Sequence, residues 1–161
     1  MCIFKPKIPH PEEPFDPNAT IENTPIDGVM GRWFLVYNVP REYWDYWEEQ
    51  IVIEVDPDFP YPAGVWGENG IRHMTVQPGY FNEGVVAHEQ AHNSYNLLTE
   101  GQKVAFANKH DELKRTNKLI KRLYEINTYG LTSDVEGHAE IYRYLHPKLP
   151  QGLESFYPKL F

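Results

Sequence analysis

The sequence has a single cysteine, Cys2, and no long apolar run. One cysteine cannot form a disulfide within the chain, so cysteine pairing does not indicate the compartment, and we assign Cys2 no role. A membrane-spanning helix needs roughly 18 or more consecutive apolar residues, which this chain lacks, and residues 1–14 lack the apolar core of a secretory signal. We therefore expect no membrane partner and a cytoplasmic location by default, with release by another route left open.

Positive charge is also scarce. The chain has 15 Lys and Arg residues against 23 Asp and Glu residues, which gives a net charge of -8. Nucleic-acid binding requires a basic surface that follows the phosphates, and the Lys/Arg-rich run at 114–122 is short. We interpret this run as a solvated helix face and predict that nucleic acid is not a partner.

Proline is absent from residues 79–146 but abundant at the start of the chain. The prolines of residues 1–28 have few apolar residues between them, a composition that disfavours both helix and sheet. We predict that residues 1–28 form an extended arm, whose role and the oligomeric state of the protein stay open. Residues 29–161 have the right size for one folded domain.

The first half of this domain has the short apolar runs of β-strands. Residues 41–50 are predicted as a short helix that presses aromatic side chains into the core. Residues 60–70, rich in proline and glycine, are predicted as a loop that contains Trp66. Three segments, each ended by turn residues, are strand candidates: Trp33–Tyr37, Ile51–Val55 and Ile71–Val76.

The second half has the apolar spacing of amphipathic helices. Asn82 is a good N-cap residue for a first helix, and residues 100–126 are predicted as one long helix or two shorter ones. Polar residues at 132–134 cap a last helix that ends near Leu145, and the tail is expected to pack back on the body. Strands followed by helices predict an α+β fold, with a small N-terminal sheet packed on the first of these helices and a helical C-terminal half.

That first helix carries the pentapeptide His88-Glu89-Gln90-Ala91-His92, which matches the HExxH zinc motif. Residues four apart lie on the same face of a helix, so both imidazoles can reach one metal ion while Glu89 flanks the open coordination position. A peptidase zinc of this kind activates a water molecule, and the glutamate accepts the water's proton. The alternative is an amphipathic helix whose two histidines have this spacing by chance.

A catalytic zinc keeps three protein ligands, so a third ligand has to come from elsewhere. A histidine in the extended metzincin pattern is excluded, because Tyr95 and Leu98 occupy the positions that this pattern requires as glycine and histidine. Glu136 and Glu140 stand four residues apart on the last helix, and we predict that Glu136 is the ligand and that Glu140 accepts a hydrogen bond from a zinc histidine. A solvated helix face is the alternative. His138 falls on the opposite face and is predicted to be a packing or surface residue.

Two segments, Ala87–Asn93 and Thr128–His146, resemble the zinc peptidase domain of anthrax lethal factor and the related bacterial Pro-Pro endopeptidases. In that family HExxH is followed by Tyr-Gly, by a glutamate seven residues after the tyrosine, and then by Ala-Glu. Tyr129, Glu136 and Glu140 stand at those positions here. The resemblance implies a zincin-like metallopeptidase fold of the gluzincin type with Zn²⁺ as its cofactor.

The resemblance also implies a role for each matching residue. It implies that His88, His92 and Glu136 bind zinc, that Glu89 is the general base, and that Tyr129 donates its hydroxyl to the tetrahedral intermediate. The two departures from the family pattern are Ala91, where glycine is common, and Gly137-His138, where the pair is usually bulky and aromatic. A more distant likeness is to small peptidases that cleave repressors, which lack the Tyr-Gly placement.

The sequence therefore predicts a zinc-dependent endopeptidase that acts on a peptide or protein substrate. An extended substrate is expected to add to a sheet edge, for which Ile71–Val76 is the candidate strand, while Trp66 either stacks on substrate or anchors its loop. The alternative to a transition-state donor at Tyr129 is a tyrosine that caps a helix or packs in the core. The competing function is a non-catalytic structural or interaction protein that retains a zincin fold. Substrate identity does not follow from the sequence.

Overall fold

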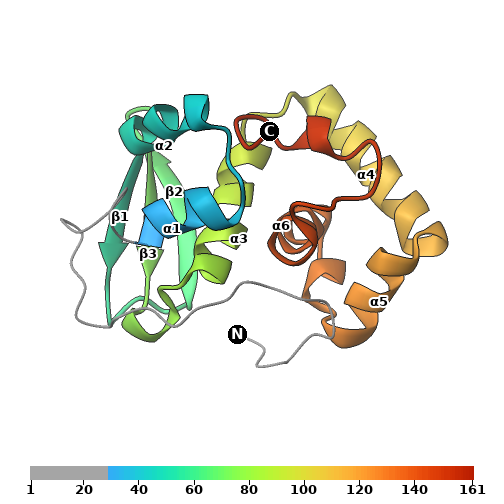
Figure 1. The fold of residues 1–161 in the computed structure, drawn as a ribbon. Helices are drawn as coiled ribbons and strands as arrows, with labels where there is room; N and C mark the ends of the chain where they lie inside the picture. Colours follow the sequence, from blue (N-terminus) through green and yellow to red (C-terminus); the bar gives the residue numbers. More distant parts are fainter. Residues whose placement is uncertain (1–28) are drawn as a thin grey trace.

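The computed structural model describes residues 29–161, so the predicted arm of residues 1–28, with Cys2, lies outside the described part. The described chain is an α+β structure in which a small mixed sheet is followed by a mainly helical half, as predicted (Figure 1). None of its helices has the length and apolar character needed to cross a membrane. The elements are α1 (Val29–Val36), η2 (Arg41–Tyr43), α2 (Trp44–Gln50), β1 (Ile51–Val55), β2 (Ala63–Glu68), β3 (Ile71–Val76), η3 (Pro78–Tyr80), α3 (Glu83–Tyr95), α4 (Glu100–Thr116), α5 (Lys118–Ile126), η4 (Tyr129–Leu131), α6 (Asp134–Leu145) and η5 (Glu154–Phe156).

Residues 33–36 belong to helix α1 and Tyr37 lies in the turn that follows, so the prediction of Trp33–Tyr37 as a strand is wrong. Met30, Trp33, Phe34 and Tyr37 are fully buried, whereas Leu35 is 65% exposed. This i, i+3, i+4, i+7 spacing is the buried stripe of a helix, and it becomes visible only when the pattern is followed back to Met30. Helix α1 packs this stripe against α3 and the rest of the core.

The sheet has the order β1-β3-β2, with β3 parallel to β1 and antiparallel to β2. Strand β3 is therefore central, and the prediction that Ile71–Val76 is an edge strand is wrong. Strands β1 and β2 are the two edges, and β2, the edge strand that lies against α3, occupies the segment that the sequence predicts to be a loop. Asn69 and Gly70 join β2 to β3 with φ angles of 52° and 79°, which is the two-residue turn that Asn-Gly favours in hairpins. That dipeptide is the sequence signal for the missed strand.

Helix α3 lies between the sheet and α6, with α4 and α5 on the far side of α6 (Figure 1). Its N-terminus is capped as predicted, since the Asn82 side chain accepts a hydrogen bond from the Val85 amide at 2.9 Å. Residues 100–126 form two helices, because Asn117 has extended backbone and caps α5 through the amides of Leu119 and Ile120. The predicted last helix is α6, and Ser133 is its N-cap.

The C-terminal tail packs on the body, as predicted. Leu153, Tyr157 and Leu160 are fully buried. His138 of α6 is buried beneath this tail, where its Nε2 lies 2.6 Å from the Phe156 carbonyl oxygen and its own carbonyl accepts the Tyr157 hydroxyl at 2.8 Å. His138 is therefore a packing residue that ties α6 to the tail.

Candidate metal centre

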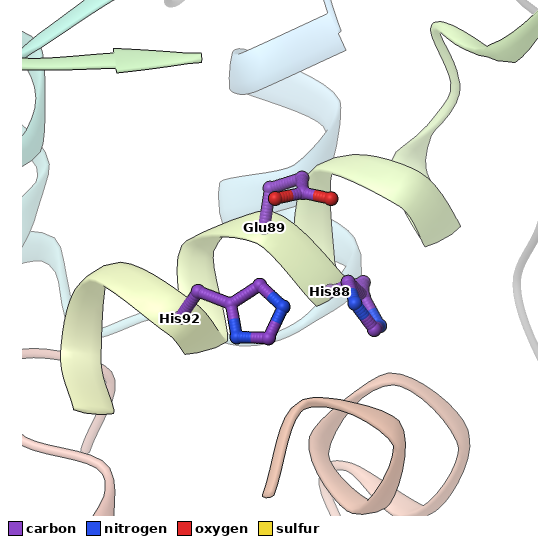
Figure 2. A group of neighbouring side chains, drawn as sticks. All are labelled: His88, Glu89 and His92. Atoms are coloured by element: carbon purple, nitrogen blue, oxygen red, sulfur yellow. The ribbon is translucent and has the colours of Figure 1, made fainter. Parts of the chain in front are cut away.

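Helix α3 carries three neighbouring side chains that can hold a metal ion: His88, Glu89 and His92. Their candidate ligand atoms lie within 4.8 Å of one another. The two histidines stand one helical turn apart on the side of α3 that faces α6, and Glu89 leaves from a neighbouring face (Figure 2). The imidazole rings meet edge to face with centroids 4.6 Å apart.

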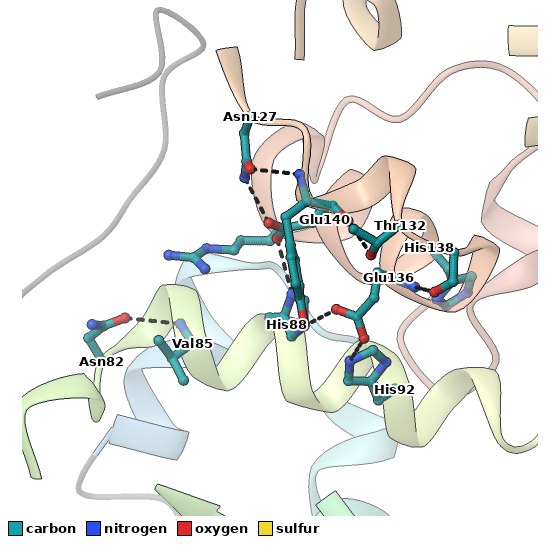
Figure 3. Close-up of polar contacts among 12 residues, drawn as sticks. Asn82, Val85, His88, His92, Asn127, Thr132, Glu136, His138 and Glu140 are labelled. Atoms are coloured by element: carbon teal, nitrogen blue, oxygen red, sulfur yellow. Dashed lines mark hydrogen bonds and ion pairs between the residues drawn. The ribbon is translucent and has the colours of Figure 1, made fainter. Parts of the chain in front are cut away.

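Helix α6 brings Glu136 to the same place. One oxygen of Glu136 lies 3.2 Å from Nε2 of His88, and the other lies 3.1 Å from Nε2 of His92 (Figure 3). The N-cap Ser133 fixes the first turn of α6 by accepting a hydrogen bond from the Glu136 amide at 3.1 Å. The carboxylate therefore bridges the two imidazoles, and both Glu136 and Glu89 are candidates for the third ligand.

These residues fit a zinc ion. Two donors about 2.0 Å from zinc at a tetrahedral angle lie about 3.3 Å apart, which is close to the separations between Glu136 and the two imidazoles. Two imidazoles and a carboxylate are also a donor set that catalytic zinc uses. Among residues 29–161, two buried polar atoms of the centre have neither a hydrogen-bond nor an ion-pair partner: Glu89 Oε2 and His92 Nδ1. We favour Glu136 over Glu89 as the third ligand, because its carboxylate reaches both Nε2 atoms.

The charges of the centre suit a bound cation. Burial alone would lower the pKa of His88, but the carboxylates of Glu136 and Glu140 outweigh burial and raise this pKa to about 10. Burial also acts to raise the pKa of Glu136, yet the two imidazoles hold it well below its ordinary value. The protein on its own thus keeps a proton between these groups. Metal ligands have to be deprotonated, so a metal ion would take the place of that proton.

Glu140 supports His88 from the opposite side. Its Oε2 lies 3.0 Å from His88 Nδ1, and its Oε1 accepts a hydrogen bond from Asn127 Nδ2 at 2.8 Å. Burial acts to raise the pKa of Glu140, but the hydrogen bond to His88, the charges of His88 and Arg143 and the hydrogen bond from Asn127 together outweigh it, and the pKa is lowered. A carboxylate can only accept, so His88 donates through Nδ1 and presents Nε2 to the centre.

The η4 turn places Tyr129 beside the histidines. Its ring centroid lies 5.9 Å from that of His88, and the side chain is 47% exposed. Burial and the nearby Glu136 carboxylate raise the pKa of Tyr129, so its hydroxyl keeps its proton and can donate it in a hydrogen bond at neutral pH. Of the two interpretations of Tyr129, the position beside the centre favours a role there over a core residue.

Two cavities meet at the centre, with volumes of about 530 and 340 Å³. Both are lined by Ala63 of β2, by His88 and Glu89 of α3, and by Tyr129. The larger cavity extends toward Tyr61, Pro62 and Arg143, and the smaller one toward Val65, Asn96 and Val135. Strand β2 thus borders a hollow that passes the centre on both sides.

The structure explains why glycine stands at position 137. A Cβ atom there would overlap the ring of His110 and would lie 2.9 Å from the Gly130 carbonyl oxygen. His110 is buried between Asp134 and Tyr124, with contacts of 2.9 Å from Nδ1 and 2.6 Å from Nε2. Glycine therefore lets α4 approach α6 immediately behind Glu136.

Sequence reasoning missed two parts of this site. Strand β2 was assigned to a loop, although Asn69-Gly70 signals a hairpin. Asn127 follows directly after the helical segment predicted at 100–126, and no local pattern distinguishes it as a partner of Glu140. The predicted residues His88, Glu89, His92, Tyr129, Glu136 and Glu140 are all brought together.

Comparison of the chain with models of protein families, with curated proteins and with solved structures finds no match. The functional inference therefore depends on the chemistry of the centre itself.

Proposed function

We propose that this protein is a zinc-dependent endopeptidase with a zincin-like fold, similar to the catalytic domain of anthrax lethal factor and the Pro-Pro endopeptidases. The observation that carries the proposal is the approach of the Glu136 carboxylate to within 3.2 and 3.1 Å of the Nε2 atoms of His88 and His92. In a metal site that only stabilises the fold, protein ligands fill every coordination position. Such a site needs neither a general base nor a hydrogen-bond donor beside the metal. Here Glu89 and Tyr129 both line the adjoining cavities.

His88, His92 and Glu136 would hold the ion. When bound, zinc supplies Lewis-acid chemistry: it polarises the scissile carbonyl and makes water more acidic. Glu89 would take the proton of the attacking water and pass it to the leaving amine. Burial raises the pKa of Glu89 although the two imidazoles act to lower it, which makes this carboxylate a better base than an exposed glutamate.

Tyr129 would stabilise negative charge on the carbonyl oxygen as the tetrahedral intermediate forms. Its hydroxyl is protonated at neutral pH, because the pKa of the side chain is raised. A preorganised donor of this kind is typically worth about 3 kcal/mol of the barrier. The side chain is partly exposed and lines the smaller cavity, so a substrate in that cavity can approach the hydroxyl.

Strand β2 is the place where an extended substrate would bind. It is the free edge beside the centre, and Ala63, Gly64 and Val65 line the smaller cavity. A peptide that pairs with this edge would pass Glu89 and Tyr129. Trp66 does not line either cavity, and its ring stacks on His73 with centroids 4.0 Å apart.

The test combines metal content with cleavage. After reconstitution we expect about one zinc per chain, by analogy with other catalytic zinc sites, and cleavage within a peptide library read by mass spectrometry. Glu89→Gln should retain zinc and lose cleavage. A wild-type protein that binds no zinc would contradict the proposal. Zinc binding without cleavage of any peptide, and identical partner binding by wild type and Glu89→Gln, would favour the structural or interaction protein.

A further inference from the structure

The side chain of Asn127 connects two parts of the centre that lie on different elements. Its Nδ2 donates to Glu140 Oε1 at 2.8 Å, and its Oδ1 accepts a hydrogen bond from the backbone amide of Tyr129 at 3.0 Å. Glu140 in turn accepts from His88 Nδ1 at 3.0 Å, so one continuous chain of hydrogen bonds runs from His88 to Tyr129 (Figure 3).

We propose that Asn127 is a positioning residue that sets the orientation of Tyr129 relative to His88. The inference rests on the proposed peptidase function, in which His88 is a zinc ligand and Tyr129 is the transition-state donor. Asn127 does not act on substrate in this proposal. It acts through Glu140 on one side and through the η4 turn on the other.

The chemistry of an amide side chain is needed at this position. Asn127 is 4% exposed, so its hydrogen bonds are made within the protein, at the wall of the larger cavity. An aspartate would keep the acceptor for the Tyr129 amide but would bring a second carboxylate against Glu140. An alanine would remove both contacts and leave a buried oxygen of Glu140 without its donor.

Two other hydrogen bonds that hold the η4 turn do not reach the centre. The Thr132 hydroxyl donates to the Tyr129 carbonyl at 2.7 Å, and the Leu131 amide donates to the Thr128 carbonyl at 2.9 Å. Thr132 is exposed, and its hydroxyl donates to Tyr129 rather than to Glu140. Thr132→Val is therefore a matched control that removes a side-chain hydrogen bond to Tyr129 without breaking the connection to His88.

A first experiment needs neither metal nor turnover. NMR of the metal-free protein would follow the Nδ1 proton of His88 and the backbone amide of Tyr129. When Asn127 is present, we expect Glu140→Gln to shift the amide signal of Tyr129. In the Asn127→Ala background, the same substitution should leave that signal unchanged. Asn127→Ala should shift both signals, Asn127→Asp mainly the His88 signal, and Thr132→Val only the Tyr129 signal. An equal response of Tyr129 to Glu140→Gln with and without Asn127 would overturn the proposal.

A second experiment uses the zinc-loaded enzyme. Removing a partner that orients a zinc ligand typically costs about 10- to 100-fold in affinity or activity. We expect Asn127→Ala to lower kcat by at least about tenfold with little change in KM, and to lower it much less in the Tyr129→Phe background. If Asn127→Ala lowers kcat by the same factor with and without Tyr129→Phe, the proposed positioning role of Asn127 is wrong. If wild type cleaves no peptide, the proposed function fails, while the NMR comparison still tests the connection.

Folding is checked first, by thermal unfolding of each variant. If Asn127→Ala does not fold, Asn127→Ser takes its place in both experiments, since it keeps a small polar side chain but is too short to make both contacts. A serine variant with wild-type NMR signals and wild-type kcat would count against the proposal.

Discussion

Glu140 Oε2 lies 3.0 Å from His88 Nδ1, although 52 positions separate the two residues in the chain. This contact joins α6 to α3 and decides which nitrogen of His88 faces Glu136. The orientation of the ring therefore depends on a helix that the HExxH motif does not contain.

Replacing Glu140 by glutamine should weaken zinc binding. The amide removes the charge that stabilises a donating Nδ1 on His88, and such partners are typically worth about 10- to 100-fold in affinity. Competition with a chromophoric chelator measures the effect. Glu125→Gln makes the same chemical change on an exposed site of α5 and should leave the affinity unaltered. Equal affinities for wild type and Glu140→Gln would show that the contact does not support the metal.

Removing the hydroxyl of Tyr129 should slow turnover without releasing zinc. Loss of one preorganised donor typically costs about 100-fold in kcat, while no ligand is changed in Tyr129→Phe. Steady-state kinetics and metal analysis on the same preparation separate these two effects. Tyr46→Phe in α2, away from the cavities, is the control. An unchanged kcat in Tyr129→Phe would show that the hydroxyl is not the transition-state donor.

Adding a methyl group at Gly137 should destabilise the fold. The new Cβ would overlap the His110 ring and press on the Gly130 carbonyl, and overpacking of this kind typically costs about 1–3 kcal/mol. Denaturant unfolding gives the change in the free energy of unfolding. At Gly101 in the first turn of α4 a new Cβ would lie 3.9 Å from the Thr99 hydroxyl oxygen, so Gly101→Ala should be neutral or stabilising. Unchanged stability of Gly137→Ala would mean that α4 can move aside.

Acid should destabilise the protein partly through His146. Burial lowers the pKa of His146 from 6.5 to about 4, and its ring packs against Tyr37, Tyr142 and Phe161. Between these two pKa values the unfolded chain binds a proton that the folded chain does not. The free energy of unfolding therefore falls as the pH falls through this window, by about 1.4 kcal/mol per pH unit.

His146→Phe should remove this contribution. Relative to its own stability at about pH 7.5, wild type should lose about 2 kcal/mol more than the variant at about pH 5. Urea unfolding of both metal-free proteins at the two pH values measures the difference. Parallel losses in the two proteins would show that His146 is not protonated selectively on unfolding.

The sequence by itself was sufficient where the signal is local. Four-residue spacing sets His88 and His92 on one face of a helix, and the Asn82 and Ser133 side chains cap helices through neighbouring amides. The i, i+4 pair of Glu136 and Glu140 was likewise readable as one helix face. These features depend on backbone geometry within a few residues, so the sequence carries them without reference to the rest of the fold.

Only the tertiary structure decided which segments meet. It placed β3 between β1 and β2, so that β2 and not β3 is the edge strand beside α3, and it joined Asn127 to Glu140. Periodicity states which face of an element is apolar but not which element covers it, and short apolar runs suit strand and helix equally. The motif residues and their spacing were determined locally, whereas the bridge of Glu136 across two imidazoles depends on the packing of α6 against α3.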